Sequence, residues 1–184
     1  RSDDTGLRIV RGRLPWLLAG LVGASVAATV VGSYEDQLAE AAILAAFLPV
    51  TMSMAGNAGL QASAVAVQGI ATGALWSGDI VFRLLKEFFA ALVNGAVAGT
   101  LLGILVMVAS FIVPLEAPDR LALATSLSLL CVTTLAAMVG ATVPIVLDRI
   151  GIDPAMAIGV FITSSNDVLG VLIFFLMPTS FYMA

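Results

Sequence analysis

Histidine is absent from this sequence of 184 residues, cysteine occurs once, and charged residues make up only 11%. Without histidine, the chain lacks the usual zinc ligand and the usual general base near neutral pH. The single cysteine, Cys131, lies in an apolar run, which excludes a disulfide framework and a thiolate metal cluster. We therefore expect neither an enzyme nor a resident cofactor.

Apolar residues dominate what is present. They make up 60% of the chain, and the mean hydropathy is +1.10. A soluble domain of this size cannot bury so much apolar surface. Five runs are long enough to cross about 30 Å of hydrocarbon, namely 16–33, 41–76, 88–113, 121–147 and 155–177. The sequence predicts an all-α, multi-pass membrane protein with five transmembrane helices.

Two stretches between these runs carry more specific expectations. The 41–76 run is too long for one straight crossing and contains Pro49, so we expect a broken or bent helix. Residues 79–87 are expected to form a separate connecting helix. Gly95, Gly99 and Gly103 share one face of the third span, which favours close packing within one chain, with a contact between two chains as the alternative.

Basic residues are distributed unevenly between the two sides of the membrane. One side would hold Arg1, Arg8, Arg11, Arg13, Arg83, Lys86 and Arg149, whereas the other would hold Arg120 among five acidic residues. Because basic loops stay inside, we expect a cytoplasmic N-terminus, an external C-terminus and insertion in the inner (plasma) membrane.

Asp167 is the most informative residue, because it lies about 20 Å into the last span. A carboxylate at that depth requires water, a cation or a partner, and no lysine or arginine lies at comparable depth. A protonated, hydrogen-bonded Asp167 is the structural alternative. Small and polar residues recur near it at helical spacing, and they predict a wet pathway: Gly159, Thr163, Asn166 and Gly170.

A second polar stripe lies in the second span, where Asn57, Gln61 and Gln68 fall within about 40° around a helix. We expect Asn57 and Gln61 to line the inner half of the pathway, with hydrogen bonding between helices as the alternative. Asn94 and the hydroxyl residues from 125 to 134 are expected to serve that packing role. All candidate ligands are hard oxygens, which suit Mg²⁺, Ca²⁺ or Mn²⁺. A two-fold dimer would supply a second carboxylate.

Several motifs resemble the transmembrane domain of the MgtE family of magnesium channels, over nearly the whole chain. They are Arg13-Leu14-Pro15-Trp16, Pro49 with Gly56-Asn57-Ala58-Gly59-Leu60-Gln61, Gly140-Ala141-Thr142-Val143-Pro144, residues 149–155, and Asp167-Val168-Leu169-Gly170. The resemblance implies a homodimer with five helices per subunit and a Mg²⁺ pore between the subunits. It also implies that Asp167 binds hydrated Mg²⁺ and that backbone oxygens at Gly159 and Thr163 hold its water shell.

The resemblance further implies how the chain is organised. Residues 1–14 are a polar lead-in that resembles the end of a linker helix, and 15–184 form the pore domain. Cytosolic regulatory domains are expected in the full-length protein, outside this sequence. The expected partners are a divalent cation, a second copy of the chain and the lipid bilayer, with no nucleic acid.

The sequence departs from the family pattern at four positions: Ala55, Leu60, Gly159 and Val160. These changes remove side-chain oxygens and a helix kink, so the preferred cation stays open. Two other functions also stay open, an ion-coupled secondary transporter and a structural membrane subunit. An aspartyl protease needs a second deep carboxylate, but Asp153 lies about 21 Å from Asp167 along the same helix.

Overall fold

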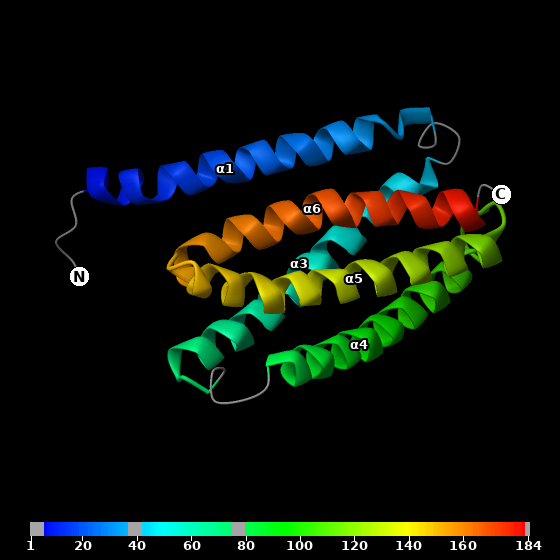
Figure 1. Cartoon of the computed structure of the whole chain (residues 1–184). Helices are drawn as coiled ribbons and strands as arrows, with labels where there is room; N and C mark the ends of the chain where they lie inside the picture. The colour runs from blue at the N-terminus through cyan, green and yellow to red at the C-terminus, as the bar shows by residue number, and fades with distance from the viewer. Residues whose placement is uncertain (1–5, 37–41, 75–79, 183–184) are drawn as a thin grey trace.

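The computed structural model describes residues 6–36, 42–74 and 80–182, with the side chains of 7–9, 155–158, 179 and 181 left out. The helices in these ranges are α1 (Gly6–Gly32), α3 (Ile43–Ala71), α4 (Ile80–Ala109), α5 (Pro118–Arg149) and α6 (Pro154–Phe181). They run back and forth along one elongated bundle, with the start of α1 and the end of α6 at opposite ends (Figure 1). The all-α prediction is confirmed.

Each of these helices is long and apolar enough to cross a membrane. The candidate spans in the described residues are Val10–Gly32, Ile43–Ala71, Ile80–Ala109, Pro118–Arg149 and Gly159–Pro178. Large apolar side chains on α4, such as Phe89, Val97 and Leu105, are more than half exposed. In a single chain they have no core to enter, and a lipid environment accommodates them. The structure thus supports the five predicted crossings.

The separate connecting helix expected from the sequence was wrong, and of the broken or bent second span the break was wrong. The second span shows no break within the described residues, because α3 is one uninterrupted helix that contains Pro49. Pro49 lies in the second turn, where it has no N–H to donate to the Ala45 carbonyl oxygen, so it removes one hydrogen bond close to the helix start without ending the helix. Residues 80–87 form the first two turns of α4 rather than a separate helix, since extending a formed helix is easier than starting a new one.

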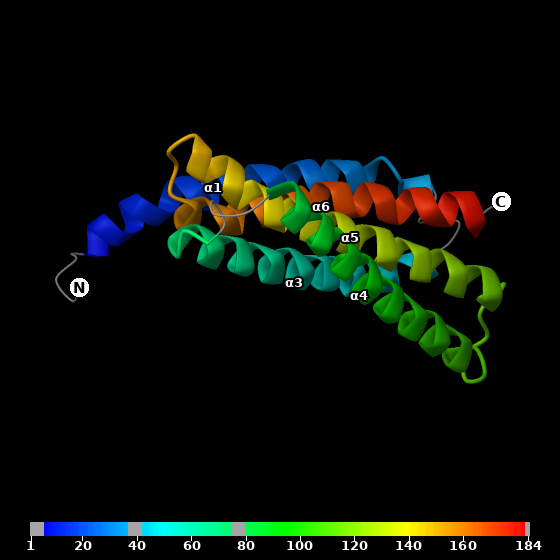
Figure 2. The same cartoon turned by 60° about the horizontal axis from the view of Figure 1, so that its bottom comes forward.

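Helix α5 is the centre of the bundle. It packs against α3, α4 and α6, whereas α1 packs against α6. Figure 2 shows α4 crossing the other helices obliquely. Because α3 and α4 both pack on α5 without extensive contact with each other, α5 separates them and forms the floor between them.

Glycines set the distance between α4 and α5. A Cβ atom on Gly99 would lie 2.6 Å from the Ser126 carbonyl oxygen, and one on Gly95 would lie 3.1 Å from the Leu130 carbonyl oxygen. Gly103 likewise faces the Ser126 side chain. Any side chain would push the two backbones apart. The prediction that these glycines pack within one chain is confirmed.

The buried hydroxyl groups of α5 had been expected to form hydrogen bonds between helices, but they bond within α5 instead. Each donates to a carbonyl oxygen four residues earlier in α5, at 2.7 to 2.8 Å: Thr125 to Leu121, Ser128 to Ala124, Thr133 to Leu129, and Thr134 to Leu130. Such bonds satisfy a buried hydroxyl within its own helix. The expectation of bonds between helices failed because the sequence does not show which way a hydroxyl turns, whereas the packing role holds, since Thr133 lies against Gly95 and Ser126 against Gly99.

Helix α1 covers one side of α6 through aromatic and small residues. Trp16 meets Phe161 edge to face with ring centroids 6.4 Å apart, and Tyr34 stacks on Phe175 at 4.6 Å. Between these pairs, a Cβ on Gly23 would collide with the side chain of Ser164. This contact fixes which side of α6 faces α1, and therefore which sides remain for other roles.

Candidate cation site

Asp167 lies between two packed faces of α6. On one side, Ser164 and Phe161 contact α1. On the other side, Ile162 and Asn166 lie against α3 at Gly59. Asp167 falls between these faces around the helix, since successive residues are rotated by about 100°. Its side chain is partly exposed, so the structure does not bury this carboxylate in the packing of one chain.

Thr163 and Gly159 continue the same strip of α6, one and two turns nearer the helix start. Both residues are exposed, and a Cβ on Gly159 would meet no described heavy atom within 4 Å. The Thr163 hydroxyl donates a hydrogen bond of 2.6 Å to the Gly159 carbonyl oxygen. That bond leaves the lone pairs of the hydroxyl oxygen free to accept from water. We call Gly159, Thr163 and Asp167 the Asp167 strip.

The charge of Asp167 is uncompensated within the described part of one chain. None of the interactions found there engages its carboxylate, and no three histidine, cysteine, aspartate or glutamate residues come together as a metal-binding group. One chain therefore offers one carboxylate and several neutral oxygens. This arrangement can attract a cation that keeps most of its water, but it cannot replace the whole hydration shell of the ion.

Asn166 and Gly170 lie inside the helix packing. Asn166 is 5% exposed and donates from Nδ2 to the Ala55 carbonyl oxygen at 3.3 Å. A Cβ on Gly170 would come within 3.0 Å of Met52 and 3.2 Å of Val132. The structure thus assigns both residues contacts with α3 or α5. Their expected place along the pathway stays a prediction that these contacts do not support.

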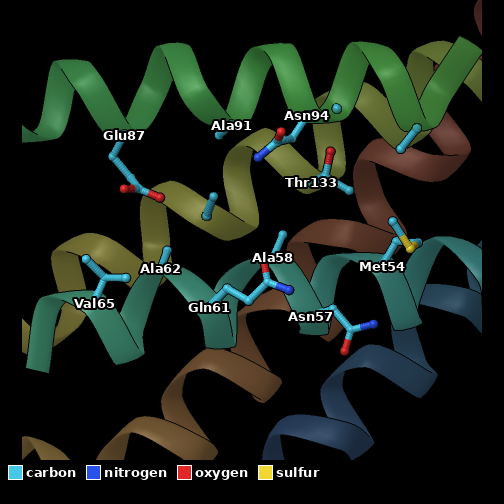
Figure 3. Close-up of a pocket in the computed structure, with 13 residues that line it drawn as sticks. Met54, Asn57, Ala58, Gln61, Ala62, Val65, Glu87, Ala91, Asn94 and Thr133 are labelled. Atoms are coloured by element: carbon cyan, nitrogen blue, oxygen red, sulfur yellow. The ribbon is translucent and has the colours of Figure 1, made fainter. Parts of the chain in front are cut away.

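Asn57 and Gln61 lie at a second polar region, on the other side of α3. Both line a cavity of about 450 Å³ between α3 and α4, with Thr133 of α5 at its floor. In Figure 3, Asn57 points away from α4, whereas the side chains of Glu87 and Asn94 extend from α4 into the space. Of the second polar stripe, Gln61 therefore lies at this cavity with Glu87 and Asn94, whereas the Asn57 side chain points away from α4.

Glu87 and Asn94 are the polar residues of this cavity that sequence reasoning missed. Glu87 had been placed in a connecting helix and Asn94 among the packing residues. In the structure both are on α4, and Asn94 is exposed. Their seven-residue spacing puts them on one helix face, and the small residues Ala91 and Gly95 lie on that face. This spacing was the available signal.

Five membrane-spanning helices that carry an uncompensated intramembrane carboxylate are typical of an ion-transporting membrane protein. Comparison with known sequences is more specific. The sequence pattern of the MgtE family, described as divalent cation transporter, matches residues 48–177. The chain belongs to the MgtE family of divalent cation transporters, which is a transporter family and not an enzyme family.

Named relatives agree with this assignment. The magnesium transporter MgtE of Enterococcus faecalis is 35% identical over 179 residues, which are 97% of this chain and 38% of that protein. The magnesium transporters MgtE of Bacillus subtilis and Thermus thermophilus are 31% and 29% identical, over 92% and 88% of this chain. The chain spans 34–38% of the length of these relatives.

Proposed function

We propose that this chain is the membrane-spanning part of a Mg²⁺ channel. Hydrated Mg²⁺ passes through a pore at a homodimer interface, and Asp167 is the ion-binding carboxylate. The observation that carries the proposal is the Asp167 strip. It presents a carboxylate without a partner among the described residues, a hydroxyl and an open backbone on a part of α6 that neither α1 nor α3 covers.

A second copy of the chain completes the site chemically. Two Asp167 carboxylates facing each other repel, and a divalent cation between them relieves that repulsion. Mg²⁺ releases its water reluctantly, so the ion is held through its hydration shell by the carboxylates and the oxygens of Thr163 and Gly159. The departures at Ala55, Leu60, Gly159 and Val160 remove possible oxygen ligands, and Mn²⁺ and Ca²⁺ are therefore the competing ions to test.

The remaining organisation follows from the length of the relatives and from the distribution of charge. Residues 1–14 form a lead-in from a linker helix, and residues 15–184 form the pore domain. Cytosolic regulatory domains belong to the rest of the full-length protein, in keeping with the 38% coverage of the first relative. The N-terminus is cytoplasmic, the C-terminus is outside, and the protein lies in the inner membrane.

Two other functions make different predictions for the same residue. An ion-coupled secondary transporter would protonate and release Asp167 in each cycle, so its flux would require a second ion gradient and would saturate at a low rate. A structural membrane subunit would use Asp167 for folding or assembly only. The partly exposed carboxylate, without a partner among the described residues, favours ion binding over assembly within one chain.

The test is Mg²⁺ uptake into liposomes containing the purified chain, compared with Asp167→Asn. We expect uptake in the wild type and a loss of roughly ten- to a hundredfold in the variant. The reason is that a hydrogen bond to a charged group contributes about 1.5–3 kcal/mol. Uptake without a sodium or proton gradient distinguishes the channel from the ion-coupled transporter.

Asp119→Asn is the matched control, because it makes the same chemical change at an exposed position in the first turn of α5. This control should transport Mg²⁺ like the wild type. Both variants are also compared with the wild type for folding and dimerisation by size-exclusion chromatography. Unchanged uptake in a folded Asp167→Asn protein would remove Asp167 as the ion site, and loss of the dimer would indicate the structural role.

A further inference from the structure

The cavity between α3 and α4 is a second polar site, separate from the Asp167 strip. Its polar lining is one carboxylate, two amides and a hydroxyl, from Glu87, Gln61, Asn94 and Thr133, and Asn57 lines it with its side chain turned away from α4. The other lining residues are Val65, Met54 and small residues. Gln61 and Asn94 are exposed within helices that cross the membrane. Polar side chains at this depth require water or another polar partner, so the cavity is suited to an aqueous ligand.

The charge of the cavity is negative. Glu87 is partly exposed, and no ion pair or hydrogen bond among the described residues engages its side chain. Arg83, one turn earlier on α4, is held by α3 instead: it donates to the Val65 carbonyl oxygen at 3.2 Å and lies against Gly69. Lys86 lies over the Phe82 ring, 4.4 Å from its centroid. A cation is therefore the ligand that this charge favours.

The size and spacing of the cavity fit a hydrated ion. Six water molecules occupy roughly 180 Å³ at about 30 Å³ each, well within the cavity volume of about 450 Å³. Glu87 and Asn94 are separated by two helical turns, roughly 10 Å along α4. A hexahydrated Mg²⁺ is about 7 Å across, given its Mg–O distances of about 2.1 Å. Both side chains can thus reach the water shell of one ion.

Helix α3 separates this cavity from the Asp167 strip. One face of α3 carries Gln61 into the cavity, and the opposite side carries Ala55 and Gly59 against α6. Asn94 lies about 21 Å along α4 and Asp167 about 20 Å along α6, both from the same end of the bundle. The two polar regions therefore lie at similar depth, on opposite sides of α3.

We propose that this cavity is a second divalent-cation site, in which the Glu87 carboxylate and the amide oxygens of Gln61 and Asn94 accept hydrogen bonds from the water shell of the ion. With no group of three acidic, histidine or cysteine residues in the described parts of the chain, the ion is held through water and not by direct chelation. The choice of a divalent cation rests on the proposed transport function, whereas the location rests on the cavity itself.

The test counts bound Mn²⁺ on the whole chain in lipid nanodiscs by electron paramagnetic resonance, with Mg²⁺ as the competitor. We expect Glu87→Gln to lose one Mn²⁺ per chain and to retain the ions that depend on Asp167. Asp167→Asn should show the reverse pattern. Asp148→Asn is the control, since it removes a carboxylate from the last turn of α5, outside the residues that line the cavity.

A third variant keeps the test decisive if Glu87→Gln does not fold. Asn94→Asp adds a carboxylate to the same cavity face and should tighten Mn²⁺ binding at this site at least tenfold, an effect that misfolding cannot produce. Unchanged binding in both Glu87→Gln and Asn94→Asp overturns the second site. Loss of an ion in Glu87→Gln but not in Asp167→Asn would sustain the second site and count against Asp167 as an ion site.

Discussion

At the scale of single residues, helices α3, α5 and α6 meet closely at Gly59, Gly140 and Asn166. A Cβ on Gly140 would collide with the Gly59 carbonyl group, and a Cβ on Gly59 would lie 2.7 Å from Asn166 Nδ2. Two backbones in direct contact, with an amide fitted beside them, leave no room for a methyl group. The packing next to Asp167 therefore depends on these two glycines.

Gly140→Ala tests this junction. Overpacking typically costs about 1–3 kcal/mol, and here the obstacle is backbone, which yields less readily than a side chain. The better helix propensity of alanine offsets at most about 1 kcal/mol of that cost. We expect a lower melting temperature in detergent, by roughly 2–8 °C, measured by tryptophan fluorescence.

Gly56→Ala is the matched control for this substitution. It makes the same chemical change in the middle of α3, but its Cβ would meet no described atom within 4 Å. Its melting temperature should equal or exceed that of the wild type. An equal loss of stability in both variants would mean that glycine is needed at Gly140 for its backbone flexibility and not for close packing.

At the scale of helices, the sequence predicted the number and character of the elements because apolar runs of membrane length have few alternatives. It predicted their boundaries less well. Residues 80–87 contain Arg83, Lys86 and Glu87, which suggested an aqueous connection, yet they continue α4. The charged groups remain compatible with the helix because Arg83 reaches the α3 backbone and Lys86 lies over Phe82.

The candidate site was predictable in the same uneven way. Asp167 was evident, because a deep carboxylate without a nearby basic residue is rare. Asn166, the next residue, is polar for a different reason, since its amide bonds to Ala55 of another helix. Spacing along α6 places Asp167 beside the polar stripe that contains Asn166, but only the positions of α1 and α3 show that Asn166 is covered and Asp167 is open. The positions of α1 and α3 are part of the tertiary structure, and spacing along one helix does not show them.

The hydroxyls of α5 provide a prediction at this scale. Thr125→Val and Ser128→Ala remove groups that bond within α5, so the free energy of unfolding should change by less than about 0.5 kcal/mol. Asn166→Leu removes a bond between helices and should cost about 0.6–1.7 kcal/mol. Unfolding in sodium dodecyl sulfate measures all three. A cost in Thr125→Val as large as that in Asn166→Leu would mean that these hydroxyls do connect helices.

At the scale of the whole molecule, charge divides the two ends of the bundle. In the described chain, the end where α4 begins and α5 finishes carries Arg83, Lys86 and Arg149 with three carboxylates, those of Glu87, Asp148 and Asp153. The other end carries Arg120 with four carboxylates, those of Glu35, Asp36, Glu116 and Asp119. The start of α1, with Arg11 and Arg13, lies at the end where α4 begins (Figure 1). Basic residues next to short loops are retained in the cytoplasm, and this distribution predicts one orientation.

Asp119→Cys and Ile150→Cys, each in a Cys131→Ala background, test that orientation. These residues lie at opposite ends of α5, and the Ile150 side chain is 62% exposed. A membrane-impermeant maleimide added to intact cells should label Asp119→Cys and leave Ile150→Cys unlabelled until the cells are permeabilised. Labelling of Ile150→Cys alone would mean that the topology is inverted and that the Gly159 end of the Asp167 strip faces outside. Equal labelling of both would indicate two orientations, which a pore between identically oriented subunits cannot accommodate.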